Sequence, residues 1–242
     1  QRQMCIRDSL FMQAPTGVGK TISTIFPAVK AVGEELADRI FYLTAKTITA
    51  TVAKETFALL EKNGYRAKTI QITAKEKLCP CDEMECNPVT CPYAKGHFDR
   101  VNDAVFDLLH RCEMIERDDI LSQADRYTVC PFELCLDTAS WCDNVICDYN
   151  YVFDPNVYLK RFFQEGIKGD YIFLIDEAHN MVERSRQMYS AQIYKEDFLT
   201  VKRIMKEHSR SIEKALEKCN KILLGMKREC CLLYTSPSPR DA

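Results

Sequence analysis

Residues 10–21 read LFMQAPTGVGKT, an apolar run followed by a glycine-containing turn that ends in Gly-Lys-Thr. The run can form a buried strand, and Ile22, Ile25, Phe26 and Val29 follow the turn at the spacing of one helix face. This order indicates a phosphate-binding loop, because backbone N–H groups and the helix N-terminus point at the phosphates. We expect the nucleotide-binding residues to be Ala14, Pro15, Thr16, Gly17, Val18, Gly19, Lys20 and Thr21.

Two side chains of this loop have distinct expected roles. Lys20 adds a positive charge for the β and γ phosphate oxygens, and Thr21 offers its hydroxyl to Mg²⁺. Ala14 stands where the strict pattern has glycine, but Gly17 and Gly19 supply the tight turn. We therefore predict ATP and Mg²⁺ as ligands.

The rest of the chain alternates strands with helices. Four further apolar runs are typical of buried strands, at residues 40–44, 68–73, 145–149 and 171–175. Residues 47–62 have a helical pattern, and Gly64 follows in the position of a C-terminal glycine. The alternation predicts an α/β fold with a parallel sheet and crossover helices.

Residues 176–179 read DEAH and follow the apolar run at 171–175 directly. The carboxyl end of a parallel strand is where such a sheet presents its ligands. Asp176 can hold the Mg²⁺ of a nucleotide, and Glu177 can orient and deprotonate the attacking water. A capped helix start, with acids favoured at its N-terminus, is the alternative reading of this tetrapeptide.

The chain has 242 residues, with 46% hydrophobic and 28% charged side chains, which excludes a largely disordered class. Its net charge of −2 averages a basic start (residues 1–78, +5), an acidic middle (79–180, −12) and a basic end (181–242, +5). The net charge of the whole chain therefore excludes no class of binding partner. No apolar run is long enough to span a membrane and no signal peptide is recognisable, so we expect a cytoplasmic protein with reduced thiols and no membrane partner.

Nine of the thirteen cysteines fall between Cys79 and Cys147. Cys79, Cys81, Cys86 and Cys91 are separated by one, four and four residues, and 38 residues lie between Cys91 and Cys130. Thiolates at such spacing can hold tetrahedral zinc or an iron–sulfur cluster, and the spacing leaves both open. The cysteines expected in the core instead are Cys112, Cys135, Cys142 and Cys147.

Three motifs together resemble a known family. Residues 14–21 resemble motif I, residues 42–47 (YLTAKT) motif Ia, and residues 176–179 the DEAH box of superfamily 2 helicases. The cysteine block between motif Ia and the DEAH box resembles the iron–sulfur branch of XPD/DinG-like enzymes. The resemblance implies a P-loop (RecA-like) motor domain, an inserted cysteine-rich iron–sulfur domain, and the start of a helical arch-like insert.

The resemblance also implies roles for individual residues. The catalytic set would be Lys20, Asp176, Glu177 and His179, with His179 coupling hydrolysis to nucleic acid. A [4Fe–4S] cluster would be held by Cys79, Cys86, Cys91 and Cys130, with Cys81 competing for the second position. Asn150, in the run ICDYNY at 146–151, would lie near the single strand. The family also implies 5′ to 3′ translocation.

The expected organisation follows from these assignments. Residues 10–78 and 131–187 form the first motor domain, residues 79–130 the iron–sulfur insert, and residues 188–230 the start of the arch-like insert. The last includes an amphipathic helix or helix pair over 194–229. Both ends, residues 1–9 and 231–242, resemble translated adaptor sequence, so we expect the natural protein to continue beyond them.

We therefore predict part of an ATP-dependent DNA helicase that couples hydrolysis to translocation on single-stranded DNA and to unwinding. Its partner would be single-stranded or forked DNA, and it would act as a monomer. Because the second motor domain is not in this sequence, we expect the chain alone to be inactive. Two alternatives stay open: a non-catalytic, zinc-stabilised nucleotide-binding adaptor, and an ATPase that remodels protein.

Overall fold

The computed structural model describes residues 2–6, 9–15 and 17–233. It divides into a larger unit, residues 1–189, and a smaller unit from residue 190 onward. The division lies close to the boundary expected at residue 188. Thr16, one of the expected nucleotide-binding residues, lies outside the described residues.

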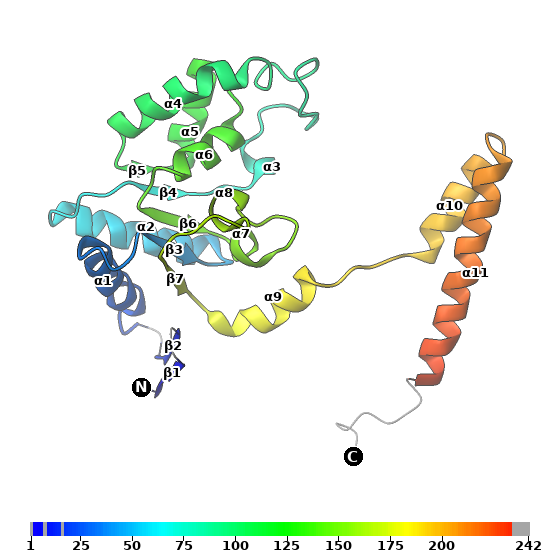
Figure 1. The fold of residues 1–242 in the computed structure, drawn as a ribbon, viewed down its shortest axis with the longest axis horizontal. Coiled ribbons are helices and arrows are strands. Elements are labelled where there is room, and N and C mark those ends of the chain that lie inside the picture. The colour runs from blue at the N-terminus through cyan, green and yellow to red at the C-terminus, as the bar shows by residue number, and fades with distance from the viewer. Residues whose placement is uncertain (1, 7–8, 16, 234–242) are drawn as a thin grey trace. The chain divides into compact units, whose positions relative to one another are not determined.

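The larger unit contains a five-stranded sheet whose order is β5-β4-β6-β3-β7 (Figure 1). Every neighbouring pair is parallel, which confirms the predicted α/β class. The strands are β3 (Arg39–Leu43), β4 (Thr69–Gln71), β5 (Met114–Ile115), β6 (Asn144–Cys147) and β7 (Tyr171–Ile175).

Helices α1 (Lys20–Gly33) and α2 (Thr47–Lys62) cover one face of the sheet (Figure 1). Their apolar residues pack against Ile40, Tyr42 and Ile146, which alternate along β3 and β6 as a pleated strand requires. Helix α2 has the predicted bounds. Gly64 follows it with φ +99°, the left-handed conformation expected at a helix C-terminus.

The other face is covered by α4 (His97–Arg111), α5 (Arg117–Tyr127) and α6 (Pro131–Ala139). These helices pack against Phe41, Leu43 and Val145. A reciprocal capping box between Glu116 and Asp119 begins α5, and Pro131 occupies the first turn of α6, where no N–H is needed. Short helices connect the layers: α3 (Lys75–Leu78), α7 (Asn150–Phe153) and α8 (Lys160–Phe163).

The cysteine-rich segment 79–130 shares the core of the larger unit. Its strand β5 extends the main sheet beside β4, and its helices α4 and α5 bury residues in the same core cluster as β3 and α6. The segment is therefore built into the sheet rather than standing apart from it.

The prediction of a buried strand at Leu10–Gln13 is wrong. Strand β2 (Ser9–Gln13) is exposed along its length and pairs antiparallel with β1 (Arg2–Ile6). The preceding residues form a hairpin with β2 and satisfy its backbone, so it lies outside the parallel sheet. Correspondingly, β7 pairs only with β3 within the described sheet, and Phe173 and Ile175 on it are exposed rather than buried.

One apolar residue expected on a packed helix face is also exposed. Phe26 on α1 points to solvent although it fits the helical spacing, and Phe98 at the start of α4 is exposed too. The buried face of α1 is formed by Ile25 and Ala28, and that of α4 by Val101, Ala104, Val105 and Leu108.

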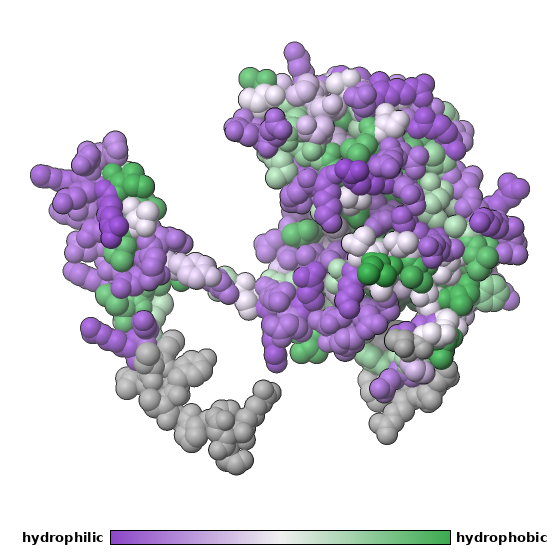
Figure 2. Space-filling model, turned by 180° about the vertical axis from the view of Figure 1, so that it is seen from behind, coloured by the Kyte–Doolittle hydropathy of each residue, from purple (hydrophilic) through white to green (hydrophobic). Residues whose placement is uncertain are grey.

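After β7 the larger unit ends in a short 3₁₀ turn (Ala178–Asn180) and α9 (Met181–Met188). The smaller unit is a helix pair, α10 (Lys195–Met205) and α11 (Arg210–Leu233), as the amphipathic pattern predicts. Its surface is largely hydrophilic with a few apolar patches (Figure 2). Among the described residues, no helix has the length and apolar character needed to cross a membrane.

The packing of Phe41 at the centre of β3 predicts how a core substitution changes stability. The Phe41 side chain is 0% exposed. The centroid of its ring lies 5.2 Å from the ring centroid of Phe162, 5.4 Å from that of Tyr171 and 5.5 Å from that of Phe173. We expect Phe41→Ala to lower the free energy of unfolding by about 3–5 kcal/mol, because it leaves a cavity between these rings. Urea unfolding measures the loss. Phe98→Ala, at an 85% exposed position, is the control and should change stability by less than about 0.5 kcal/mol. Equal losses would contradict the packing described.

Candidate active site

The glycine turn has the backbone that a phosphate loop needs. Gly17 and Gly19 have φ of +83° and +76°, values that residues with a Cβ rarely adopt. Gly19 is the residue before α1, and Lys20 is its first residue. The free N–H groups of the first turn of α1 therefore lie next to the loop.

The DEAH segment is fixed where β7 ends. The Asp176 N–H donates to the Leu43 carbonyl at 3.0 Å, which continues the ladder between β3 and β7 by one residue. Glu177 has φ +51°, a left-handed conformation that is uncommon for a residue other than glycine. Strained backbone of this kind persists where the surrounding structure enforces it, often at functional sites.

The phosphate loop and the DEAH segment meet. Lys20 Nζ lies 3.7 Å from Glu177 Oε1, and His179 Nδ1 lies 3.4 Å from Glu177 Oε2. The structure thus brings Lys20 to the segment that holds the other three residues expected to be catalytic, although Lys20 and Asp176 are separated by more than 150 positions in the chain. His179 is the outermost of the four, with a side chain 73% exposed.

The oxygen donors proposed for Mg²⁺ are also close to each other. The Tyr42 hydroxyl lies beside the side chains of both Thr21 and Asp176. Burial, followed by the negative charge of Asp176, raises the pKa of Tyr42 above its ordinary value. A hydroxyl and a carboxylate at the edge of a sheet are hard oxygen ligands of the kind Mg²⁺ takes. The residues present therefore fit this ion.

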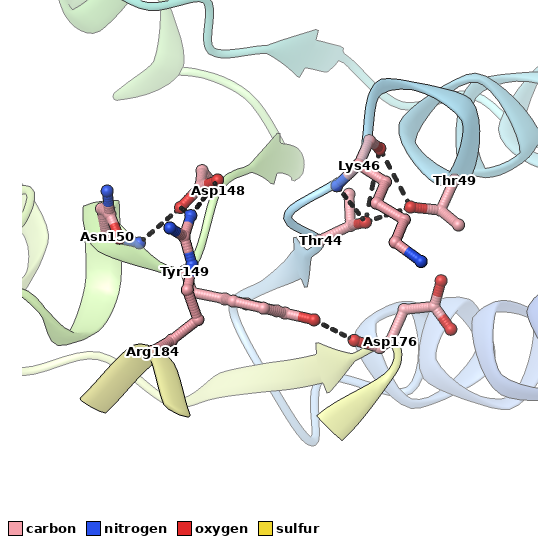
Figure 3. Close-up of polar contacts among 8 residues, drawn as sticks. All are labelled: Thr44, Lys46, Thr49, Asp148, Tyr149, Asn150, Asp176 and Arg184. Carbon is pink, nitrogen blue, oxygen red and sulfur yellow. Dashed lines mark hydrogen bonds and ion pairs between the residues drawn. The ribbon is translucent and has the colours of Figure 1, made fainter. Parts of the chain in front are cut away.

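Sequence reasoning missed a second layer of residues around Asp176 (Figure 3). The Tyr149 hydroxyl donates to the Asp176 carbonyl. Arg184 of α9 donates to both carboxylate oxygens of Asp148, at 3.2 and 3.1 Å. The only sequence signal was the polar run that follows β6.

The turn between β3 and α2, within the predicted motif Ia, is held by threonine hydroxyls (Figure 3). The Lys46 N–H donates to Thr44 Oγ at 3.3 Å, and the Thr49 hydroxyl donates to the Lys46 carbonyl at 3.0 Å. The turn thereby places the first turn of α2 at the same sheet edge as Asp176.

The thiols of the cysteine block divide into two groups. Partial desolvation and the neighbouring thiols of Cys91 and Cys79 raise the pKa of Cys81 to about 11. Cys86 lies beside Lys75 and raises the pKa of that amine, and Cys130 acts in the same direction. Among the described residues, no three cysteine, histidine or acidic side chains are gathered closely enough to hold a metal ion. The donor chemistry suits a metal centre, but the side-chain positions do not form one.

The other cysteines behave as the sequence predicts. Cys135, Cys142 and Cys147 are buried, and Cys112 packs against the core. His97, buried beside the block, accepts the Cys130 N–H at Nδ1 at 3.2 Å, and burial lowers the pKa of this imidazole.

Comparison with known proteins identifies similar sequences and folds. The DEAD_2 family model matches residues 51–198. The XPD/RAD3 helicase subunit of general transcription and DNA repair factor IIH from Saccharomyces cerevisiae is 23% identical over 204 residues, covering 70% of this chain and 26% of that protein. A Fanconi anemia group J protein homolog from Gallus gallus is 29% identical over 76 residues, covering 31% of this chain and 6% of that protein. The chain therefore spans about a quarter or less of these relatives.

Two solved structures share the fold. A truncated XPD aligns over 86% of this chain and 58% of its own length, with a TM-score of 0.52 and 16% identity. An XPD helicase aligns over 87% of this chain and 36% of its own length, with a TM-score of 0.50 and 16% identity. At this level of identity the alignments describe the parallel-sheet α/β fold.

The two classes of thiol predict different reactivity. Burial raises the pKa of Cys135 and Cys142 from 9.0 to about 12, and also raises that of Cys147. At pH 8 only about one in ten thousand of these thiols would be the reactive thiolate. In the iron-free chain we expect iodoacetamide to label the exposed Cys86 first and to spare these three until the chain unfolds, as measured by peptide mass spectrometry.

The raised pKa values of these thiols also predict the direction in which folding stability changes with pH. The unfolded chain loses these protons near pH 9.0 and the folded chain near 12, so their contribution to stability is complete below pH 9.0 and is lost as the pH rises toward 12. Labelling of Cys135 at the rate of Cys86 would contradict the burial described.

Proposed function

Because the chain belongs to the DEAD_2 family, we propose that it is part of an ATP-dependent DNA helicase that hydrolyses ATP to translocate on single-stranded DNA and unwind duplexes. The observation that carries the proposal is the meeting of Lys20 with Glu177, 3.7 Å apart, beside Thr21 and Asp176. A phosphate loop and a carboxylate pair at one sheet edge are the two parts that phosphoryl transfer from ATP needs.

Each residue has a definite task in this proposal. The N–H groups at the start of α1 and the Lys20 ammonium bind the phosphates, and Thr21 and Asp176 would hold Mg²⁺. Mg²⁺, when bound, neutralises charge on the phosphate oxygens. Glu177 orients a water and accepts its proton, and Lys20 leaves the carboxylate for the phosphates once nucleotide binds. His179, in contact with Glu177 and exposed, is placed to sense a nucleic acid.

The nucleic-acid partner and the location are part of the same proposal. Single-stranded or forked DNA would be bound by a monomer in the cytoplasm. Basic side chains of the helix pair are candidates for backbone contacts, although Lys202 already pairs with Glu217 at 3.9 Å. These residues are Lys195, Lys202, Arg203, Lys206, Arg210 and Lys214.

We also propose that Cys79, Cys86, Cys91 and Cys130 hold a [4Fe–4S] cluster. Thiolate ligands and their place between the motif Ia turn and the DEAH segment support it. Cys81, adjacent to Cys79 and Cys91 in the structure, competes for the position of Cys86. No step of ATP hydrolysis is derived from the cluster.

Lys20→Ala tests the nucleotide site. In the full-length protein that contains this chain, we expect DNA-stimulated phosphate release to fall at least about 100-fold, because a charge that stabilises the transition state is removed. Lys30→Ala, in the last turn of the same helix and exposed, should hydrolyse ATP normally. Equal rates in the two variants would overturn the site. Hydrolysis that DNA does not stimulate would favour the protein-remodelling alternative.

Anaerobic purification tests the cluster. We expect a brown protein with broad visible absorbance and with bound iron and sulfide. Cys91→Ser should lose iron and unwinding but keep ATP binding, because the thiols lie apart from Lys20, and Cys219→Ser on α11 is the control. Comparing the iron content of Cys81→Ser and Cys86→Ser identifies the second ligand. A colourless protein with stoichiometric zinc would favour the adaptor alternative, and an intact cluster in Cys91→Ser would refute the ligand assignment.

A further inference from the structure

Two buried tyrosines from neighbouring strands converge on Asp176. Tyr42 lies on β3 opposite Leu174 of β7, and Tyr149 lies two residues beyond β6. Their exposed fractions are 3% and 0%. Both hydroxyls therefore sit in the interior, where a polar group needs a partner.

Tyr149 acts on the backbone of Asp176. Its hydroxyl donates to the Asp176 carbonyl (Figure 3), while the Asp176 N–H donates to the Leu43 carbonyl at 3.0 Å. The two peptide groups that flank the Asp176 side chain are thus both held. Rotation of the carboxylate by backbone movement is restricted from each side.

Tyr42 acts on the side chains. Its hydroxyl lies beside the Asp176 carboxylate and the Thr21 hydroxyl, one from each of the two segments that must meet. A tyrosine hydroxyl can donate one hydrogen bond and accept another, so Tyr42 can contact both side chains at once.

We propose that Tyr42 and Tyr149 are positioning residues that fix Asp176 relative to Thr21, so that the two oxygen ligands are preorganised for the magnesium ion of the nucleotide. The inference rests on the proposed function. Neither tyrosine touches the reacting atoms. Their effect is expected on the affinity for the metal, because hydrogen bonds onto a ligating carboxylate typically change metal affinity about 10–100-fold.

Removing only the hydroxyls separates positioning from packing. Tyr42→Phe and Tyr149→Phe keep the buried rings and delete one polar contact each. Tyr65→Phe is the matched control, because the Tyr65 hydroxyl bonds Asn144 Oδ1 at 3.2 Å, near the start of β6 and away from Asp176. A general loss of stability should be similar in all three variants.

The experiment measures equilibrium binding of a fluorescent ATP analogue to the full-length protein, titrated with magnesium chloride and repeated in EDTA. We expect the magnesium concentration for half-maximal binding to rise about tenfold in Tyr42→Phe and in Tyr149→Phe, and to stay unchanged in Tyr65→Phe. Affinity in EDTA should be the same in all proteins. Each substitution is measured in its own protein, so one folded variant is sufficient.

Three outcomes overturn the inference. Wild-type magnesium dependence in a folded Tyr42→Phe or Tyr149→Phe would show that the hydroxyls do not position the ligands. An equal loss of affinity in EDTA would show a general distortion of the pocket. A shift of the same size in Tyr65→Phe would show an effect of stability alone. If the wild-type protein itself binds no magnesium nucleotide, the proposed function fails and not only this inference.

Discussion

The parallel pairing of β3 with β7 is the interaction on which the site depends. Leu43 aligns with Ile175, and the next backbone bond, from the Asp176 N–H to the Leu43 carbonyl, places the DEAH segment level with the start of α2. Because α1 packs on both of these strands, its first residue, Lys20, reaches the same edge. A shift of β7 by one residue in this register would turn Leu174 to the opposite face of the sheet and take Asp176 out of line with Leu43.

The pairing of β2 shows what local sequence does and does not determine. The apolar run at Leu10–Gln13 predicts a strand, and a strand forms there. The run does not determine which other strand it pairs with. Residues 2–6 are close in the sequence, and pairing with a nearby segment closes a shorter loop and so costs less entropy than reaching β7. No pattern in residues 10–21 alone could reveal this pairing.

The motifs predicted the side chains expected to carry the chemistry, but not the residues that hold those side chains in position. The resemblance to XPD-like helicases is confirmed by the family match over residues 51–198. Lys20 and Glu177 were recognisable because their chemistry needs those residue types beside a glycine turn and at a strand end. Tyr149 was not, because a tyrosine after a strand is usually a packing residue, and its partner Asp176 lies 27 positions away. The cysteines show the same limit: residue type predicted thiol chemistry, but the grouping of Cys81 with Cys79 and Cys91 depends on the course of an irregular loop.

The turn that carries Tyr149 also connects the DEAH segment to α7. The Asp148 carboxylate accepts the Asn150 N–H at 2.9 Å, at the start of α7, and also pairs with Arg184 of α9. Both ionic partners are about one-third exposed, so removing either one would leave the other partly desolvated and unpaired, which costs more than losing a surface pair. Any displacement of α7 must therefore either break these bonds or carry Asp148 and Tyr149 with it. In the second case the displacement reaches the Asp176 carbonyl directly, so the segment around Asn150 is joined to the proposed nucleotide site through the backbone of residues 148–150 and the hydrogen bond from Tyr149 to Asp176.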